Sequence, residues 1–507
     1  MKKINKYISL GLACSITVSC SEDLIEKPVY GVTTSENFYR NEAEIKQALT
    51  EAYTQIKGAP NYHLPATYFF IGDISTDDAL KGGASEADFN EGLQIQNFTV
   101  SADNGLVNGH WLNSYIVINR ANLVIDKAPA AAGDQELLAR YIREAKFLRA
   151  WAYFQLASSF GGVPLVLKNL SADNIYVPRS TEDEVFTQIY ADLTDATGLP
   201  ARSEYAAADM GRATSGAAWS LMGKAYMFQR NFTKAEEALS EVVNSQEYAL
   251  TPEFAWTFEN EHRNNSESIF EIQFQELSGA FFTGRHLVQF FSSRSTENGW
   301  GFHLPTQDLW DAYDPDDPRL TYTFIRIGDR FTGDSYDQDN AASASGFHDR
   351  KIFVKKNELK TVNYNVSKNW VEMRYADILL LYAEALNENG KSAEALPYLN
   401  SVRERARNSN PLDPKRTKQA YIPATDPATS LPDITTTDMD QLRQAIWRER
   451  RLELAMEGHR RDDLARQQRF GEVMRAYATK YNTDKGRLFN DSRDYVLPIP
   501  TNEVLLS

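Results

Sequence analysis

The stretch WSLMGKAYMFQRNFTKAEEALSEV, residues 219–242, decides the fold because it repeats large and small residues at helical spacing on both sides of a break at Asn231. The apolar faces before and after the break comprise Trp219, Met222 and Tyr226, then Phe232, Ala235, Leu239 and Val242. Gly223 and Ala235 stand twelve residues apart, where two antiparallel helices would cross closely. The stretch therefore predicts a helix-turn-helix unit.

The same offsets recur far downstream and predict a second helix pair. The matching positions are Leu379, Tyr382, Ala383, Leu386, Gly390, Ala395, Leu399 and Val402. Two copies of this pattern resemble tetratricopeptide repeats, which stack helix pairs of this kind. Arg230 departs from the repeat pattern because a glycine is usual at that turn. The alternative is two unrelated amphipathic helix pairs in a helical core.

The composition is that of a folded, acidic protein. Of its 507 residues, 42% are hydrophobic and 12% aromatic, which is ample for a core. A net charge of -15 argues against a nucleic-acid partner, since no large basic surface is implied. Both cysteines, Cys14 and Cys20, lie in the first twenty residues. The rest of the chain therefore has no disulfide, thiolate metal site or cysteine nucleophile.

The N-terminus has the pattern of a secretory signal. Lys2, Lys3 and Lys6 precede an apolar stretch, residues 7–18, that is too short for a stable membrane span. Residues 17–20, Thr-Val-Ser-Cys, resemble a bacterial lipoprotein cleavage site, although Thr17 replaces the usual leucine. We expect residues 1–19 to be removed, Cys20 to carry acyl chains that anchor it to a membrane, and residues 20–40 to form a tether. A conventional signal with an incidental cysteine is the alternative.

Apolar periodicity predicts further helices over residues 42–57, 111–127 and 144–160. A polar loop is expected over residues 81–92. Asp73, Asp77 and Asp78 form an acidic corner that we interpret as caps and turn formers, because it lacks the ligand spacing of a calcium loop. The last of these helices should stop at the glycine pair and proline of residues 161–164.

Residues 160–165, FGGVPL, end an aromatic helix between a lipidated cysteine and a repeat pair, and in this setting they resemble the SusD/RagB family. Further matches lie at residues 304–310 with 317–320, 374–387, 449–466 and 497–503. Arg461 and Asp462 stand where that family often has aromatic residues. The resemblance covers essentially the whole mature chain.

The resemblance implies a mainly α, SusD-like fold: a tetratricopeptide-like scaffold with a loop-rich ligand-binding region and a few short strands. Residues 41–225 and 226–507 would be its N-terminal and C-terminal parts, forming one composite globular unit. It further implies a cell-surface lipoprotein of the outer membrane that binds a nutrient, most often a glycan, and delivers it to a SusC-like TonB-dependent transporter. A RagB-like peptide-binding protein is the alternative within the family.

No pattern for catalysis, a cofactor or a metal emerges. Nucleophile-elbow, zinc-protease, phosphate-loop and dinucleotide motifs are absent, and the seven histidines are scattered. A surface glycoside hydrolase stays open because 69 acidic residues guarantee that some pair has the required separation, although the family resemblance implies a non-catalytic protein. The acidic loop with Asp334, Asp337 and Asp339 lacks the EF-hand pattern. The charged run 449–460 is expected to form ion pairs along one helix rather than an anion site.

Exposed flat aromatics beside polar side chains suit a sugar ring, which has an apolar face and a rim of hydroxyls. Residues 276–347 have little helical periodicity and many such side chains, so we expect the ligand there. The predicted contacts are Phe281, Phe282, Arg285, Phe291, Asn298, Trp300 and Tyr336, with Phe89 and Asn90 from residues 81–97. Phe290 and Phe331 lie in the same region. Packing inside the core is the alternative for each aromatic.

Overall fold

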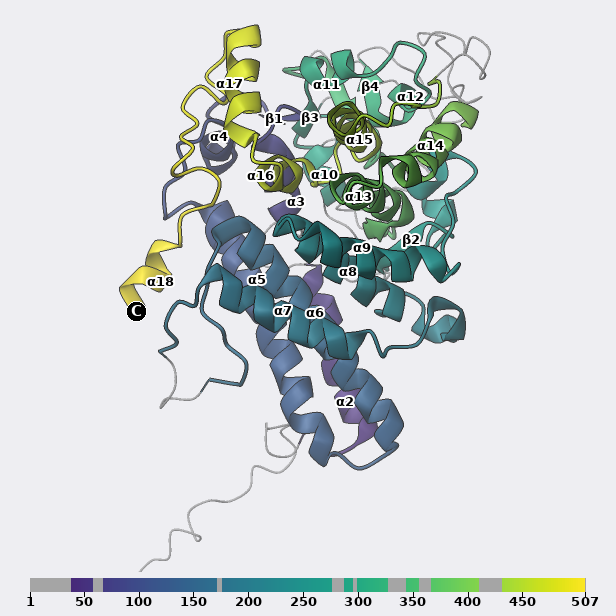
Figure 1. Ribbon diagram of the computed structural model, residues 1–507. Helices are drawn as coiled ribbons and strands as arrows, with labels where there is room; N and C mark the ends of the chain where they lie inside the picture. The colour runs from purple at the N-terminus through teal and green to yellow at the C-terminus, as the bar shows by residue number, and fades with distance from the viewer. Residues whose placement is uncertain are drawn as a thin grey trace, which may run out of the picture.

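The computed structural model describes residues 38–57, 67–170, 176–275, 287–294, 299–326, 343–354, 366–409 and 431–506. Within these residues the fold is mainly helical, as predicted, with a few short strands. Long helices of the N-terminal half lie along one another, with the two predicted helix pairs above them in Figure 1. One hydrophobic core includes residues from Ile45 to Leu497, so both halves of the chain share it.

Four long helices form the N-terminal layer: α2 (Glu42–Ile56), α5 (Gly105–Lys127), α6 (Gln135–Phe160) and α7 (Glu182–Ala196). The sequence places α2 and the ends of α5 and α6 correctly. It misses the starts of α5 and α6. The side-chain oxygens of Asn104 and Asp134 cap the first turns of these helices, and such caps lie outside the apolar pattern. Thr181 and Glu184 form a capping box at the start of α7.

The predicted helix pairs are confirmed. The first is α8 (Ser215–Phe228) with α9 (Phe232–Asn244), and the second is α13 (Tyr375–Glu388) with α14 (Ser392–Asn408). A Cβ atom on Gly223 would lie 2.4 Å from a methyl carbon of Leu239, so glycine is what allows α8 and α9 to cross so closely. Helix α13 packs against α9, which stacks the second pair on the first.

Both pairs turn through the same backbone motif. After α8, Arg230 has a φ of 57°, and Asn231 N–H donates to Tyr226 O at 2.9 Å. After α13, Gly390 has a φ of 78°, and Lys391 N–H donates to Leu386 O at 2.9 Å. A left-handed residue after a helix favours glycine, so Arg230 holds the strained version of this turn.

Three two-stranded antiparallel sheets join segments that are distant in the chain. They pair β1 (Ala79–Gly82) with β3 (Phe302–Pro305), β2 (Ser268–Ile272) with β6 (Trp370–Arg374), and β4 (Phe324–Arg326) with β5 (Phe347–Asp349). The predicted loop over residues 81–92 is thus partly wrong, since β1 ends in it and α4 (Asn90–Gln96) begins in it.

The remaining helices complete the structure. They are α3 (Thr67–Ile74), α10 (Leu287–Phe291), α11 (Gln307–Ala312), α12 (Leu320–Thr323), α15 (Met439–Glu453), α16 (Arg460–Arg466), α17 (Phe470–Tyr481) and α18 (Thr501–Leu506). Single 3-10 turns lie at η2 (Ala128–Ala130), η3 (Arg202–Glu204), η4 (Ala207–Asp209), η5 (Phe254–Thr257) and η6 (Asn260–His262). Across the described ranges, no helix is both long and apolar enough to cross a bilayer.

The charged run on α15 forms ion pairs, but the expectation that they run along one helix is wrong. Glu449 pairs with Arg319 at 2.6 Å and with Arg403 at 2.5 Å, and Glu453 pairs with Arg374 at 2.6 Å. These carboxylates are fully buried. Other segments cover α15 on several sides, so its charges meet partners from across the fold instead of solvent.

The acidic corner is also more than a set of caps. Asp77 pairs with Arg460 and Arg451 at 2.9 Å each, and Asp78 pairs with Arg451 at 2.7 Å. All three aspartates of the corner are buried, because the C-terminal helices pack over them. At the family position that often holds an aromatic, the buried Arg461 donates to backbone oxygens of Ser158 and Tyr495.

Candidate ligand-binding site

The two segments predicted to contact a ligand meet at one end of the β1–β3 sheet. The register pairs Ala79 with Pro305 and Gly82 with Phe302. Gly83 N–H then donates to Gly301 O at 2.7 Å. The loop after β1 and the segment before β3 therefore lie side by side, although more than 200 residues separate them in the chain.

Four aromatic side chains gather at this junction, and we call them the aromatic platform: Phe89, Phe290, Trp300 and Phe302. Trp300 is 41% exposed, and its ring centroid lies 4.2 Å from that of Phe290. Phe302 contacts Trp300 edge-on at 6.4 Å and Phe89 at 5.0 Å. The platform thus has a buried base, Phe302, and an exposed indole at its edge.

The backbone holds Trp300 in place from both sides. Trp300 N–H donates to Gln289 O at 2.8 Å, and Gly301 N–H donates to Ser292 O at 2.9 Å. A Cβ atom on Gly299 would lie 2.2 Å from Ser292 O, so only glycine fits there. The indole is therefore presented on a fixed frame, which lowers the entropic cost of stacking a ligand on it.

An ion pair forms the polar rim of the platform. Arg294 Nη2 lies 3.0 Å from Asp88 Oδ2, and both side chains are about one third exposed. The same oxygen of Asp88 accepts from Ala84 N–H at 2.8 Å. A Cβ atom on Gly301 would lie 3.2 Å from Arg294 Cγ, which places the arginine stem beside the Gly301 backbone, directly after Trp300.

Lys81 organises the loop that carries Asp88. Its buried ammonium donates to three backbone oxygens, those of Ser85 at 2.9 Å, Glu86 at 3.4 Å and Asp88 at 2.5 Å. Burial lowers the pKa of Lys81. Three convergent carbonyls give the loop one geometry, so Asp88 faces Arg294 from a fixed position.

The predicted contacts that the structure describes differ in their exposure to solvent. Trp300 and Asn90 are exposed, and Phe89 is half-buried with a φ of 62°. Phe291 is buried against Phe70 and His303, so a ligand reaches it only if neighbouring rings move. The predicted signal segment 1–19 lies outside the described residues, as do Cys20, Phe281, Phe282, Arg285, Asn298, Phe331, Asp334, Tyr336, Asp337 and Asp339.

The sequence does not single out Phe302, Arg294 or Asp88 as site residues. Phe302 could have been found from the alternating glycine and aromatic residues at 299–302. Arg294 and Asp88 could not, because their contact depends on the pairing of β1 with β3, which no local pattern predicts.

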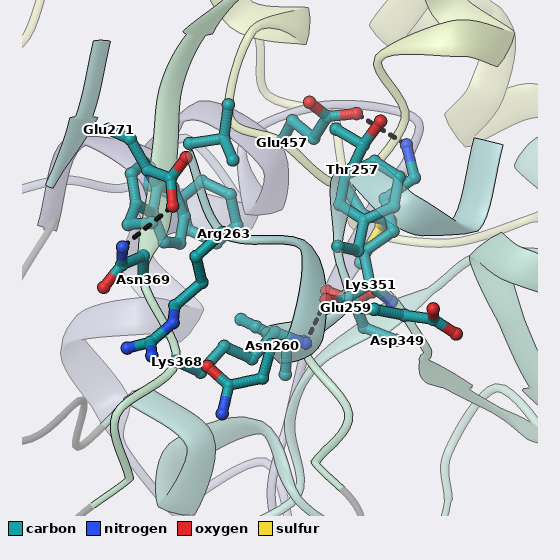
Figure 2. A pocket seen from close by; sticks show the side chains of 16 residues that line it. Thr257, Glu259, Asn260, Arg263, Glu271, Asp349, Lys351, Lys368, Asn369 and Glu457 are labelled. Carbon is teal, nitrogen blue, oxygen red and sulfur yellow. Dashed lines mark hydrogen bonds and ion pairs between the residues drawn. The ribbon is translucent and has the colours of Figure 1, made fainter. Parts of the chain in front are cut away.

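A second pocket is lined in part by Trp370 and Val371 of β6 and is shown in Figure 2. Its lining includes Phe258, Trp370 and Asn260. Two of its carboxylates are already engaged: Glu457 pairs with Lys351 at 2.7 Å, and Glu271 accepts from the Asn369 amide at 2.8 Å. Lys368 donates to Lys351 O and Phe353 O, both at 2.8 Å. Pairing of these groups makes the pocket part of the scaffold rather than an open polar site.

Neither site holds a cluster typical of a metal centre. Over the part of the chain that the structure describes, no group of three or more His, Cys, Asp or Glu side chains is placed to hold a metal ion. The chemistry on offer at the platform is stacking and hydrogen bonding.

Comparison with known proteins matches both halves of the chain. A family model described as "Starch-binding associating with outer membrane" matches residues 26–227, and one described as "SusD family" matches residues 266–507. The SusD-like protein P2 of Formosa agariphila is 27% identical over 99% of this chain and 98% of its own. A SusD-like protein of Bacteroides ovatus is 24% identical over 80% of this chain and 76% of its own.

Solved structures agree with the fold. A laminarin binding SusD-like protein has a TM-score of 0.74 and 27% identity, covering 92% of this chain and 98% of its own. A SusD-like carbohydrate binding protein of Bacteroides fragilis has a TM-score of 0.77 and 25% identity, covering 92% and 99%. With both halves matched by family models and the fold matched over nearly its whole length, this chain belongs to the SusD/RagB family.

Proposed function

We propose that this protein binds a neutral glycan on the aromatic platform at the cell surface and delivers it to a SusC-like TonB-dependent transporter. The observation that carries the proposal is Trp300, an exposed indole on a fixed backbone frame beside the Arg294–Asp88 pair. The predicted contacts Phe89, Asn90 and Trp300 belong to this proposal.

The platform matches both the apolar face and the hydroxyl rim of a sugar ring. The C–H face of a pyranose stacks on an indole, as in other aromatic ligand contacts. Its hydroxyls need donors and acceptors at the rim, which the guanidinium of Arg294 and the carboxylate of Asp88 supply. Asn90, exposed at the start of α4, adds an amide on the neighbouring segment.

The local charge favours a neutral ligand over an anionic one. The charge of Arg294 is balanced by Asp88, and the Lys81 ammonium is occupied by three carbonyl oxygens. Glu86 is exposed on the same loop. A uronate or sulfate group would therefore find no free cation among these side chains to balance its charge, on a chain whose overall net charge is -15.

Named relatives support a glycan as the ligand class. One SusD-like relative binds laminarin and another is a carbohydrate binding protein, and both share the fold over most of this chain. A surface glycan-binding protein of Bacteroides thetaiotaomicron in complex with laminarihexaose is 23% identical and supports the fold alone. The family model over the N-terminal half names starch.

Calorimetry with the purified protein tests the ligand class directly. We expect binding to laminarin or soluble starch and weaker binding to polygalacturonate and to a mixed peptide pool. Preference for peptides would support a RagB-like role, and preference for polygalacturonate would overturn the charge argument. Chromatography of the same mixtures should show glycans of unchanged length, whereas shorter products would reveal a glycoside hydrolase.

The anchor and the transporter are further parts of the proposal. Acylation of Cys20 would hold the protein at the outer membrane, facing the exterior, and the stacked helix pairs would give the transporter a rigid face. We expect Cys20→Ala to lose acyl labelling and membrane attachment. Cross-linking of intact cells should recover a TonB-dependent barrel with the wild-type protein, and recovery of no such barrel would contradict the transporter role.

A further inference from the structure

A buried histidine lies directly beneath the aromatic platform. His303 is three residues after Trp300, in β3, and is completely buried. Its φ of 60° is left-handed, which a histidine adopts rarely and which persists only where the surroundings enforce it. The neighbours of the imidazole ring show what enforces this angle.

Two buried carboxylates face the two ring nitrogens. Nε2 lies 3.0 Å from Asp73 Oδ2, and Nδ1 lies 3.4 Å from Asp349 Oδ2. Only the Asp73 contact has hydrogen-bond geometry, whereas Asp349 lies within ion-pair distance of Nδ1. A neutral imidazole has only one N–H, so a carboxylate beside each nitrogen favours the doubly protonated ring. Burial alone would lower the pKa of His303, but Asp349 and Asp73 outweigh it and raise the pKa to about 9.

The two carboxylates come from different parts of the fold. Asp73 belongs to α3 and also accepts from Gly458 N–H at 3.0 Å, while Asp349 ends β5. The imidazolium thereby ties β3 to the N-terminal half, to β5 and to the segment before α16. Removing the charge would leave two buried carboxylates facing each other across an uncharged ring.

The same ring supports the base of the platform. Three phenylalanine rings pack around it, with centroids 4.6 to 5.9 Å away: Phe69, Phe70 and Phe291. Phe70 contacts Phe89 at 5.8 Å, and Phe302 precedes His303 directly in β3. The backbone angle at His303 therefore affects the direction in which β3 continues back through Phe302 to Trp300.

From this geometry we propose that His303, held as a cation between Asp73 and Asp349, is a positioning residue for Trp300 and the aromatic platform. The proposal rests on the platform being the ligand site, as proposed above. It places His303 one layer behind the ligand, where it sets the position of the indole without touching a sugar.

Other titratable groups surround this triad. Asp78 directly precedes β1, Lys81 lies on it, and Lys351 follows β5. Lys485 donates to Ile74 O and Ala79 O from the C-terminal segment. His348 on β5 is another buried histidine, and neither of its ring nitrogens has a hydrogen-bond partner among the residues that the structure describes. Burial lowers the pKa of His348 to about 4, so its ring is neutral where that of His303 is charged.

The test measures the indole directly, without a ligand. Full-length protein labelled with 5-fluorotryptophan gives one ¹⁹F resonance for Trp300, assigned by its loss in Trp300→Phe. In the variant His303→Asn, asparagine tolerates a positive φ and keeps a polar side chain, but the positive charge is lost. We expect His303→Asn to move the Trp300 resonance at neutral pH, while His348→Asn, the matched control, leaves it in place.

The pH profile separates positioning from a general packing defect. In the wild type the Trp300 resonance should stay constant near neutral pH and shift as His303 loses its proton around pH 9. In His303→Asn that step should be absent, and glycan affinity should fall about tenfold with the melting temperature checked in parallel. An unmoved resonance with an unchanged pH step in His303→Asn would overturn the proposal.

Failure of the proposed function gives a different pattern. If the wild type binds no glycan but the ¹⁹F shifts occur as expected, His303 still positions Trp300 and the ligand assignment is what fails. If glycan binds normally to His303→Asn, and its Trp300 resonance matches the wild type, the positioning role is wrong while the ligand site stands.

Discussion

Replacing Glu453 by Gln tests how much the fold depends on the buried charges of α15. Glu453 is completely buried and accepts from three guanidinium groups, those of Arg374 at 2.6 Å, Arg319 at 3.0 Å and Arg405. Gln keeps the size of the side chain but removes the charge that balances these cations. Breaking a buried ion pair by removing one partner costs about 3–5 kcal/mol.

The matched control is Asp440→Asn on the same helix. Asp440 pairs with Arg443 three residues away, and its side chain is 83% exposed. An exposed pair of this kind contributes less than about 1 kcal/mol. Urea unfolding followed by far-UV circular dichroism should therefore show a large fall in midpoint for Glu453→Gln and almost none for Asp440→Asn. Equal midpoints for the two variants would refute the reasoning.

The pH dependence of this difference has a definite sign. Burial would raise the pKa of Glu453, but Arg405, Arg374 and Arg319 lower it overall. A carboxylate with a lowered pKa stabilises the folded state above its unfolded pKa of about 4.3 and loses that contribution as pH falls through the folded value. The gap between wild type and Glu453→Gln should therefore be full at neutral pH and shrink in strong acid.

Three further predictions follow from the same structure. Gly390→Ala should lower the unfolding free energy by about 1 kcal/mol, because an L residue is strained at a φ of 78°. A Cβ atom there meets nothing within 4 Å, so the cost comes from the backbone alone, and an unchanged urea midpoint would contradict this. Asp463→Asn should make the free energy of unfolding depend less on pH in acid. Arg450 and Arg466 outweigh burial and lower the pKa of Asp463 to about 2, so the wild type loses the contribution of this carboxylate as pH falls through that value. An acid unfolding curve like the wild type's would contradict this. Lys81→Met should speed hydrogen exchange over residues 83–89 while leaving α5 protected, and unchanged exchange in that loop would show that the ammonium does not hold it.

Local patterns in the sequence predict the helical scaffold well. The apolar periodicity of residues 219–242 and of their downstream copy predicts α8, α9, α13 and α14, because each apolar face is formed by residues three or four apart in the chain. Helix starts are less visible, since Asn104 and Asp134 act through cap hydrogen bonds outside the apolar pattern. Arg230 shows that a turn is also made by a residue that propensity disfavours.

The proposed ligand site is only partly predictable. Trp300 is recognisable from its glycine neighbours and polar surroundings, and the structure leaves it exposed. Asp88 and Arg294 are 206 residues apart, so their pairing depends on the β1–β3 register, for which the sequence has no local signal. The same holds for His303, whose carboxylate partners lie on α3 and β5. Buried charge networks escape prediction because they are defined by the tertiary fold.

The affinity of Trp300→Ala for a neutral glycan tests the central claim most directly. Calorimetry should compare it with Tyr176→Ala, which removes a 77% exposed aromatic outside the platform, after circular dichroism shows that both variants are folded. Loss of stacking on Trp300 should weaken laminarin or starch binding at least about tenfold, equivalent to about 1.4 kcal/mol, while Tyr176→Ala binds as the wild type does. Equal affinity of Trp300→Ala and the wild type would contradict the account.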